Sequence, residues 1–171
     1  AEVYPTPELV GFLQHARQLP TLGWPQARRY LLLDTPFDLL PPNYERLLFE
    51  VRLAGLVPVL AHPERSRVLA SDPGRLGAYV AQGVLAQVTA GSLLGEFGPQ
   101  AQVAAWVFLE RGWAHAVASD GHDAQRRSPA SLAAAFRHVS RRLGEELALR
   151  LFRDNPEAMA LGRPLPQAQV A

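Results

Sequence analysis

Short apolar runs alternate along the chain with longer stretches of helical periodicity. The runs at 30–34, 57–61, 84–88 and 114–118 consist largely of Leu, Val and Ala, which is typical of buried strands. A further strand is predicted at Glu2-Val3-Tyr4. Because continuous apolar strands that alternate with helices form parallel sheets covered on their faces, the pattern predicts an α/β fold.

Capping residues and Pro mark the starts of the intervening helices. Helices are predicted to begin at Thr6, Asn43, Asp72, Gln100, Ser128 and Asn155. The Phe and Trp residues mostly fit the apolar faces of these helices and are predicted to belong to the core. We therefore predict one domain over residues 1–162 and a tail, rich in Pro and Gln, over 163–171.

Composition narrows the classes of function. The chain of 171 residues is 48% hydrophobic and 19% charged, as expected for a folded domain, and no apolar run is long enough to span a membrane. The absence of Cys excludes disulfides and thiolate metal sites, and the absence of Lys excludes a Schiff base. A net charge of +1 argues against nucleic acid as a partner. Without a signal-peptide pattern at the N-terminus, we expect a cytoplasmic location.

Acids and imidazoles follow the predicted strands. Asp34 and His62 each come directly after an apolar run, Asp120 and His122 follow another, and Glu2 lies on the possible first strand. Because the carboxyl ends of parallel strands converge on one site, we expect these side chains to meet. Carboxylates and imidazoles without Cys suit divalent cations such as Mn²⁺, Zn²⁺ or Fe²⁺.

Such a cluster suits phosphoryl chemistry. Two or more close metals activate water and stabilise both oxygens of a phosphoryl displacement. Arg65 and Arg127 are candidates for forked hydrogen bonds to phosphate. Taken singly, each residue has a plainer interpretation: His62 as a structural or capping residue, Asp34 and Asp120 as turn residues, and Glu64 as an ion-pair partner of Arg65. The joint position at strand ends favours the metal site.

Three motifs occur in a fixed order: Ala61-His62-Pro63-Glu64-Arg65, the segment 87–98 (QVTAGSLLGEFG), and Ser119-Asp120-Gly121-His122. Together they resemble the capsular-polysaccharide type of bacterial protein-tyrosine phosphatase, a member of the polymerase-and-histidinol-phosphatase (PHP) superfamily. The resemblance covers about residues 1–162. It implies a distorted parallel (β/α)7-type barrel that hydrolyses phosphotyrosine with water activated on metal ions.

The resemblance also implies roles for single residues. Metal ligands carry over at Glu2, His62, Asp120 and His122, while Asp34 stands where the family usually has Glu. Arg65, Arg127 and His122 are the residues implied to be catalytic, the two arginines by holding phosphate. The cofactor implied is Mn²⁺, or another divalent ion such as Zn²⁺, Fe²⁺ or Mg²⁺, with two or three ions in a complete site.

The front of the family pattern is missing. The family begins with a strand that carries His-x-His, and this chain starts after that point, so we expect the fold to be incomplete at the N-terminus and the chain to be the C-terminal two-thirds of the domain. Exposed sheet edges would then leave homo-oligomerisation open. If the chain is complete as given, weak or absent phosphatase activity is expected.

Several functions remain open from the sequence. The leading hypothesis is a protein-tyrosine phosphatase whose partner is a phosphotyrosine protein, a bacterial tyrosine kinase in the regulation of exopolysaccharide and capsule. The alternatives are a small-molecule phosphatase of the histidinol-phosphate kind, or a degenerate, non-catalytic metal-binding module.

Overall fold

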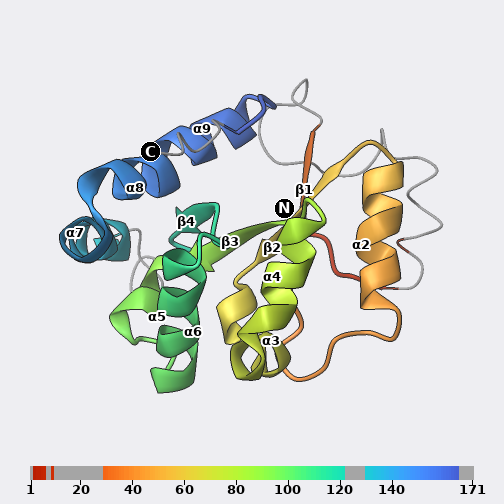
Figure 1. Cartoon of the computed structure of the whole chain (residues 1–171), viewed down its shortest axis with the longest axis horizontal. Coiled ribbons are helices and arrows are strands. Elements are labelled where there is room, and N and C mark those ends of the chain that lie inside the picture. The colour runs from red at the N-terminus through yellow and green to blue at the C-terminus, as the bar shows by residue number, and fades with distance from the viewer. Residues whose placement is uncertain (1, 7–8, 10–28, 122–129, 166–171) are drawn as a thin grey trace.

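A four-stranded parallel sheet forms the centre of the protein (Figure 1). The computed structural model describes residues 2–6, 9, 29–121 and 130–165. The strands follow each other in the order β1 (Tyr30–Leu33), β2 (Val57–Ala61), β3 (Leu85–Thr89) and β4 (Ala116–Ala118). Val3 adds a parallel bridge to Leu33 on the outer side of β1. The predicted α/β fold with a parallel sheet is confirmed, and its strand ends lie at one edge.

Helices connect and cover the strands. They are α2 (Tyr44–Leu53), the 3₁₀ turn η2 (Pro63–Arg65), α3 (Arg67–Ser71), α4 (Pro73–Ala81), α5 (Ala90–Leu94), α6 (Pro99–Glu110), α7 (Ala130–Leu143), α8 (Glu145–Leu149), the π-helical η3 (Arg150–Asp154) and α9 (Asn155–Ala160). Figure 1 shows α3 to α6 on one side of the sheet and α9 on the other. No helix in the described part of the chain has the length and apolarity that a membrane crossing needs.

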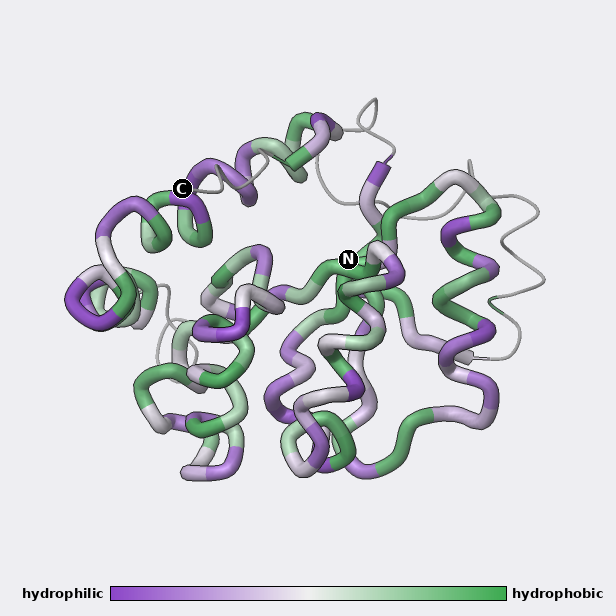
Figure 2. The backbone as a smooth tube through the Cα atoms, in the orientation of Figure 1, coloured by the Kyte–Doolittle hydropathy of each residue, from purple (hydrophilic) through white to green (hydrophobic). Residues whose placement is uncertain are grey.

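The two faces of the sheet enter different clusters because successive strand residues point to opposite sides. Leu31, Leu33 and Leu60 pack with the helices in the main core, in which the strands are among the most hydrophobic parts of the chain (Figure 2). The other face contributes Tyr30, Leu32, Val59, Ala61 and Ala116 to a smaller cluster that Met159 and Leu165 help to cover. The Tyr30 hydroxyl also donates a hydrogen bond of 2.5 Å to the carbonyl of Arg163.

Some expectations from the sequence need correction or lie outside the described residues. Asn43 directly precedes α2, but its backbone is left-handed (φ 61°) and its side chain makes no capping hydrogen bond. The helices α3 and α5 were not predicted, since five residues are too few to show a period. Among the described residues the sheet is open, with β1 and β4 at opposite ends of the strand order. The helix starts at Thr6-Pro7 and Ser128-Pro129 fall partly or wholly outside the described residues.

Glu64 anchors the turn that follows β2. Its side chain is completely buried, and Oε1 accepts hydrogen bonds from the Thr89 N–H at 3.0 Å and the Ser92 hydroxyl at 2.7 Å. These bonds tie η2 to the end of β3 and the start of α5. The predicted ion pair between Glu64 and Arg65 is wrong, because Glu64 points into the core and Arg65 pairs with Asp120 at 2.9 Å.

Burial raises the pKa of Glu64 to about 7, although the hydrogen bonds from Ser92 and Thr89 act in the opposite direction. Its second oxygen, Oε2, is buried without a hydrogen-bond partner among the described residues. A buried carboxylate oxygen that lacks a donor destabilises the ionised form. Burial of this group therefore favours the folded state most when the carboxyl group is protonated, although the two hydrogen bonds to Oε1 are themselves stronger with a carboxylate.

Replacing a central strand residue is expected to destabilise the fold. Leu60 in β2 is completely buried, so Leu60→Ala should lower the free energy of unfolding by about 2–5 kcal/mol. Leu53→Ala is the matched control, because Leu53 is 66% exposed and its change should stay within about 0.5 kcal/mol. Urea denaturation followed by circular dichroism measures both. Equal losses would contradict the assignment of β2 to the core.

The buried carboxyl group should make stability depend on pH. The pKa of Glu64 is raised in the folded state, so its stabilising contribution is full below the unfolded value near 4.5 and declines as pH rises to about 7. Glu64→Gln keeps an acceptor oxygen, but its amide group does not titrate. We expect the unfolding free energy of the original protein to fall relative to that of the variant, by a few kcal/mol between pH 4.5 and 7.5. Parallel curves in urea titrations across this range would refute the raised pKa.

Candidate metal centre

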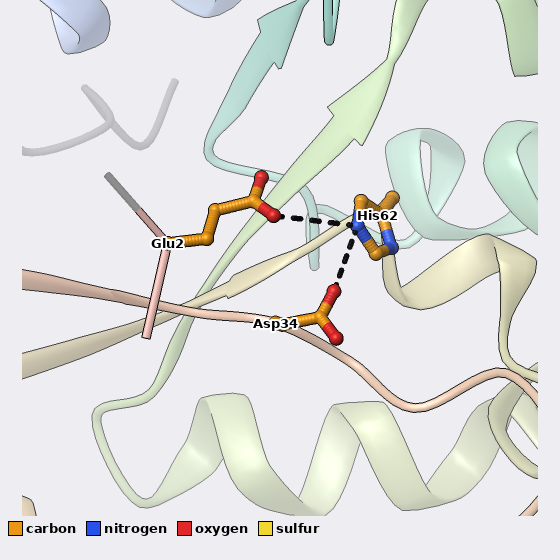
Figure 3. A group of neighbouring side chains, drawn as sticks. All are labelled: Glu2, Asp34 and His62. Atoms are coloured by element: carbon orange, nitrogen blue, oxygen red, sulfur yellow. Dashed lines mark ion pairs between the residues drawn. The ribbon is translucent and has the colours of Figure 1, made fainter. Parts of the chain in front are cut away.

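Three of the predicted ligands meet at the carboxyl edge of the sheet. His62 Nε2 lies 3.1 Å from Asp34 Oδ1 and 3.9 Å from Glu2 Oε2 (Figure 3). One ligand atom from each residue lies within 4.8 Å of the others, and both carboxylates point toward the same ring nitrogen. In the described part of the chain this is the group whose spacing suits a metal ion.

The sheet register explains the convergence. Asp34 directly follows β1, and its N–H donates a 3.0 Å hydrogen bond to the carbonyl of Val3, which places Glu2 beside it. His62 directly follows β2, and its N–H donates to the carbonyl of Gln87 in β3 at 2.8 Å. Because β1 also pairs with β2, with Leu33 opposite Leu60, backbone hydrogen bonds hold these three segments, which are distant in sequence, side by side.

Two of the predicted ligands occupy strained backbone positions. His62 has φ 38° and Asp120 has φ 50°, both in the left-handed region that residues other than Gly rarely adopt. Each such position costs on the order of 1–3 kcal/mol, and strain of this kind clusters at functional sites. Both residues follow a strand, His62 directly after β2 and Asp120 two residues after β4, and their side chains contact Asp34 and Arg65 respectively.

The donor set fits a divalent cation. The His62 side chain is only 4% exposed, and burial, then the charge of Arg65, lowers the pKa of its imidazole. The neutral ring that results is the form that binds metals. Ligand atoms that lie about 2.0–2.2 Å from a shared ion are about 3–4 Å apart, close to the observed separations from His62 to the two carboxylates.

Arg65 forms the second part of the site. Its Nη1 pairs with Asp120 Oδ2 at 2.9 Å, and its guanidinium carbon lies 4.7 Å from the ring centroid of Phe37 and 4.3 Å from that of Phe97. The Phe37 ring also stacks on His62, with 5.5 Å between ring centroids. One carboxylate and two aromatic rings thus hold a cation beside the metal-ligand group, where it can bind an anion.

The two rings were not foreseen as parts of a site. The Phe residues were expected in the core, yet Phe37 is 47% exposed in the loop after β1. The sequence feature that could have indicated a role for Phe37 in the site is its position three residues after Asp34, a predicted metal ligand. Phe97 lies within the 87–98 motif, and Gly91 permits its approach, because a Cβ there would lie 2.9 Å from the Phe97 ring. Two other predicted site residues, His122 and Arg127, lie outside the described residues.

Comparison with known proteins places this arrangement in a family. The sequence model of the capsular polysaccharide synthesis family CpsB/CapC matches residues 3–160. Tyrosine-protein phosphatase YwqE of Bacillus subtilis is 39% identical over 100 residues, which is 58% of this chain and 39% of the relative. Tyrosine-protein phosphatase CpsB of Streptococcus pneumoniae is 28% identical over 166 residues, which is 94% of this chain and 66% of the relative.

The fold agrees with a solved structure. A chain from the crystal structures of YwqE from B. subtilis and CpsB from S. pneumoniae, described as metal-dependent tyrosine phosphatases, superposes with a TM-score of 0.83 at 31% identity. The match covers 98% of this chain and 65% of that one, so the chain spans about two-thirds of the length of its structural neighbour. The match of sequence and fold across nearly all of these residues shows that the chain belongs to the CpsB/CapC family of capsular polysaccharide synthesis proteins.

Proposed function

We propose that this protein is a metal-dependent protein-tyrosine phosphatase. The observation that carries the proposal is the convergence of Glu2, Asp34 and His62 beside the guanidinium of Arg65. The first group suits cations and the second suits a phosphate, so their neighbourhood fits a phosphate ester better than either would alone. The tyrosine phosphatases among its relatives support the same activity.

Each residue has a role in this proposal. The ligands of two or three ions, Mn²⁺ or another divalent metal, are Glu2, Asp34, His62, Asp120 and His122. When bound, the ions supply an activated water and a counter-charge for the phosphoryl oxygens. Arg65 and Arg127 bind the phosphate, and His122 also takes part in catalysis. Asp120 orients Arg65 through their ion pair, while neutral His62 fixes the position of the two carboxylates that face it.

The substrate belongs to the same proposal. We infer a phosphotyrosine protein, specifically a bacterial tyrosine kinase that acts in the cytoplasm on exopolysaccharide and capsule synthesis, in line with the family description. We also propose that the open parallel sheet belongs to a distorted (β/α)7-type barrel of the PHP kind, with one domain over 1–162 and a tail over 163–171. The second apolar face of the sheet supports the barrel, because it resembles an interior surface.

Hydrolysis measured with two substrates tests the activity. With Mn²⁺ present, kcat/KM should be higher for a phosphotyrosine peptide than for histidinol phosphate. Arg65→Lys keeps the charge but loses the forked donors, so kcat/KM for the peptide should fall about 10- to 100-fold. Arg46→Lys is the control, because the Arg46 side chain is 74% exposed on α2 and takes no part in the site. A preference for histidinol phosphate would contradict the proposed protein-tyrosine phosphatase, and no turnover of either substrate would favour the non-catalytic metal-binding module.

Metal binding can be measured without turnover. Asp34→Asn removes a charged ligand 3.1 Å from His62 Nε2, and we expect the affinity for Mn²⁺ to fall at least about 10-fold in isothermal titration calorimetry. Asp38→Asn serves as the control, because Asp38 lies on the same loop but its side chain is 74% exposed and pairs with Arg67. Unchanged Mn²⁺ affinity in the Asp34 variant would exclude this residue as a ligand.

A further inference from the structure

We propose that Phe37 is a specificity-determining residue whose ring contacts the aryl group of a phosphate monoester bound at Arg65. This inference rests on the proposed phosphatase function and deepens it, since it names the residue that favours aryl over alkyl phosphates.

Phe37 spans the two halves of the site. Its ring stacks on the imidazole of His62 at an interplanar angle of 26°, and the guanidinium of Arg65 lies 4.7 Å from its centroid. The ring therefore borders the space between the metal-ligand group and the phosphate-binding cation. A phosphate ester held by both would place its ester oxygen, and the group attached to it, next to this ring.

The ring is presented to solvent on a fixed backbone. The carbonyl of Phe37 accepts a 2.7 Å hydrogen bond from the N–H of Arg67 at the start of α3, which holds the loop in place. Nevertheless 47% of the residue is exposed. A half-exposed aromatic ring beside charged groups has apolar area left to cover, and a substrate ring is a partner of the right chemistry.

A cavity beside the ring has room for such a substituent. Its volume is about 300 Å³, and its lining includes Phe37, Arg65, Arg67, Phe97 and Gln100. Small-molecule sites combine apolar walls with a few oriented polar groups, which is the mixture found here. The cavity therefore offers the substrate an aromatic wall on the same side as the guanidinium.

Phe97 provides an internal comparison. Its ring lies 4.3 Å from the Arg65 guanidinium carbon, whereas the ring stacked on His62 is that of Phe37. Phe97 thus acts as a positioning residue for the arginine. Because Phe97 lines the same cavity, its loss should weaken binding of every phosphate through the arginine and lower the preference for aryl phosphates less than loss of Phe37 does.

The test compares two phosphate analogues that share a phosphonate group and differ in the attached group. The Mn²⁺-loaded full chain is titrated with phenylphosphonate and methylphosphonate, whose C–P bonds a phosphatase does not hydrolyse, by isothermal titration calorimetry. The original protein should bind phenylphosphonate about three- to tenfold more tightly, and Phe37→Ala should abolish most of that preference. Phe97→Ala should weaken both ligands and keep more of the preference than Phe37→Ala does. Phe49→Ala is the matched control, because Phe49 is 51% exposed on α2.

Each outcome bears on the proposal. Equal binding of the two ligands, or a preference that survives in Phe37→Ala, would overturn the role of Phe37 and leave the phosphatase function intact. Binding of neither ligand would overturn the proposed phosphate site as well. Phe37→Leu keeps apolar bulk without a ring, and it serves as a second variant if the alanine variant does not fold. A folded leucine variant that has lost the preference supports the ring contact, and one that retains it contradicts the contact.

Discussion

The site depends on one buried carboxyl group. In the sequence His62-Pro63-Glu64-Arg65, Glu64 lies between two residues of the candidate site. Its Oε1 atom accepts hydrogen bonds from the Thr89 N–H and the Ser92 hydroxyl in the core. This anchor holds η2 against β3 and α5 while the backbone at His62 stays left-handed. The proposed metal ligand His62 and the proposed phosphate-binding Arg65 lie on the same short turn, and both are therefore held in place by the hydrogen bonds of Glu64.

The chemistry of the site follows from charges gathered at one sheet edge. Asp34 and Glu2 face His62, whose pKa is lowered chiefly by burial, so the neutral imidazole offsets little of the negative charge. A divalent cation would supply the missing counter-charge. Arg65, held by Asp120 and two aromatic rings, supplies a fixed cation beside it. Together these features support the proposed binding of a metal ion and a phosphate at this edge of the sheet.

The sequence was most informative where local pattern and topology agree. Short apolar runs predict β1 and β2. Because the carboxyl ends of parallel strands converge, the sequence also predicts that Asp34 lies near His62, as the structure shows. The sequence could not reveal the hydrogen-bond partners of Glu64, because Thr89 and Ser92 lie 25 or more positions away along the chain. The place of Phe37 in the site could not be predicted for a related reason. Its contacts with His62 and Arg65 join residues distant in sequence, and without them an aromatic residue is expected to lie in the core.

The proposed function requires cations at the edge of the sheet where Glu2, Asp34 and His62 meet. Anomalous diffraction from crystals of the protein grown with Mn²⁺ would locate the ions directly. We expect an anomalous peak within about 2–2.5 Å of His62 Nε2 and of an Asp34 carboxylate oxygen. Manganese bound only elsewhere, with His62 and Asp34 still in direct contact, would exclude a metal site at this edge.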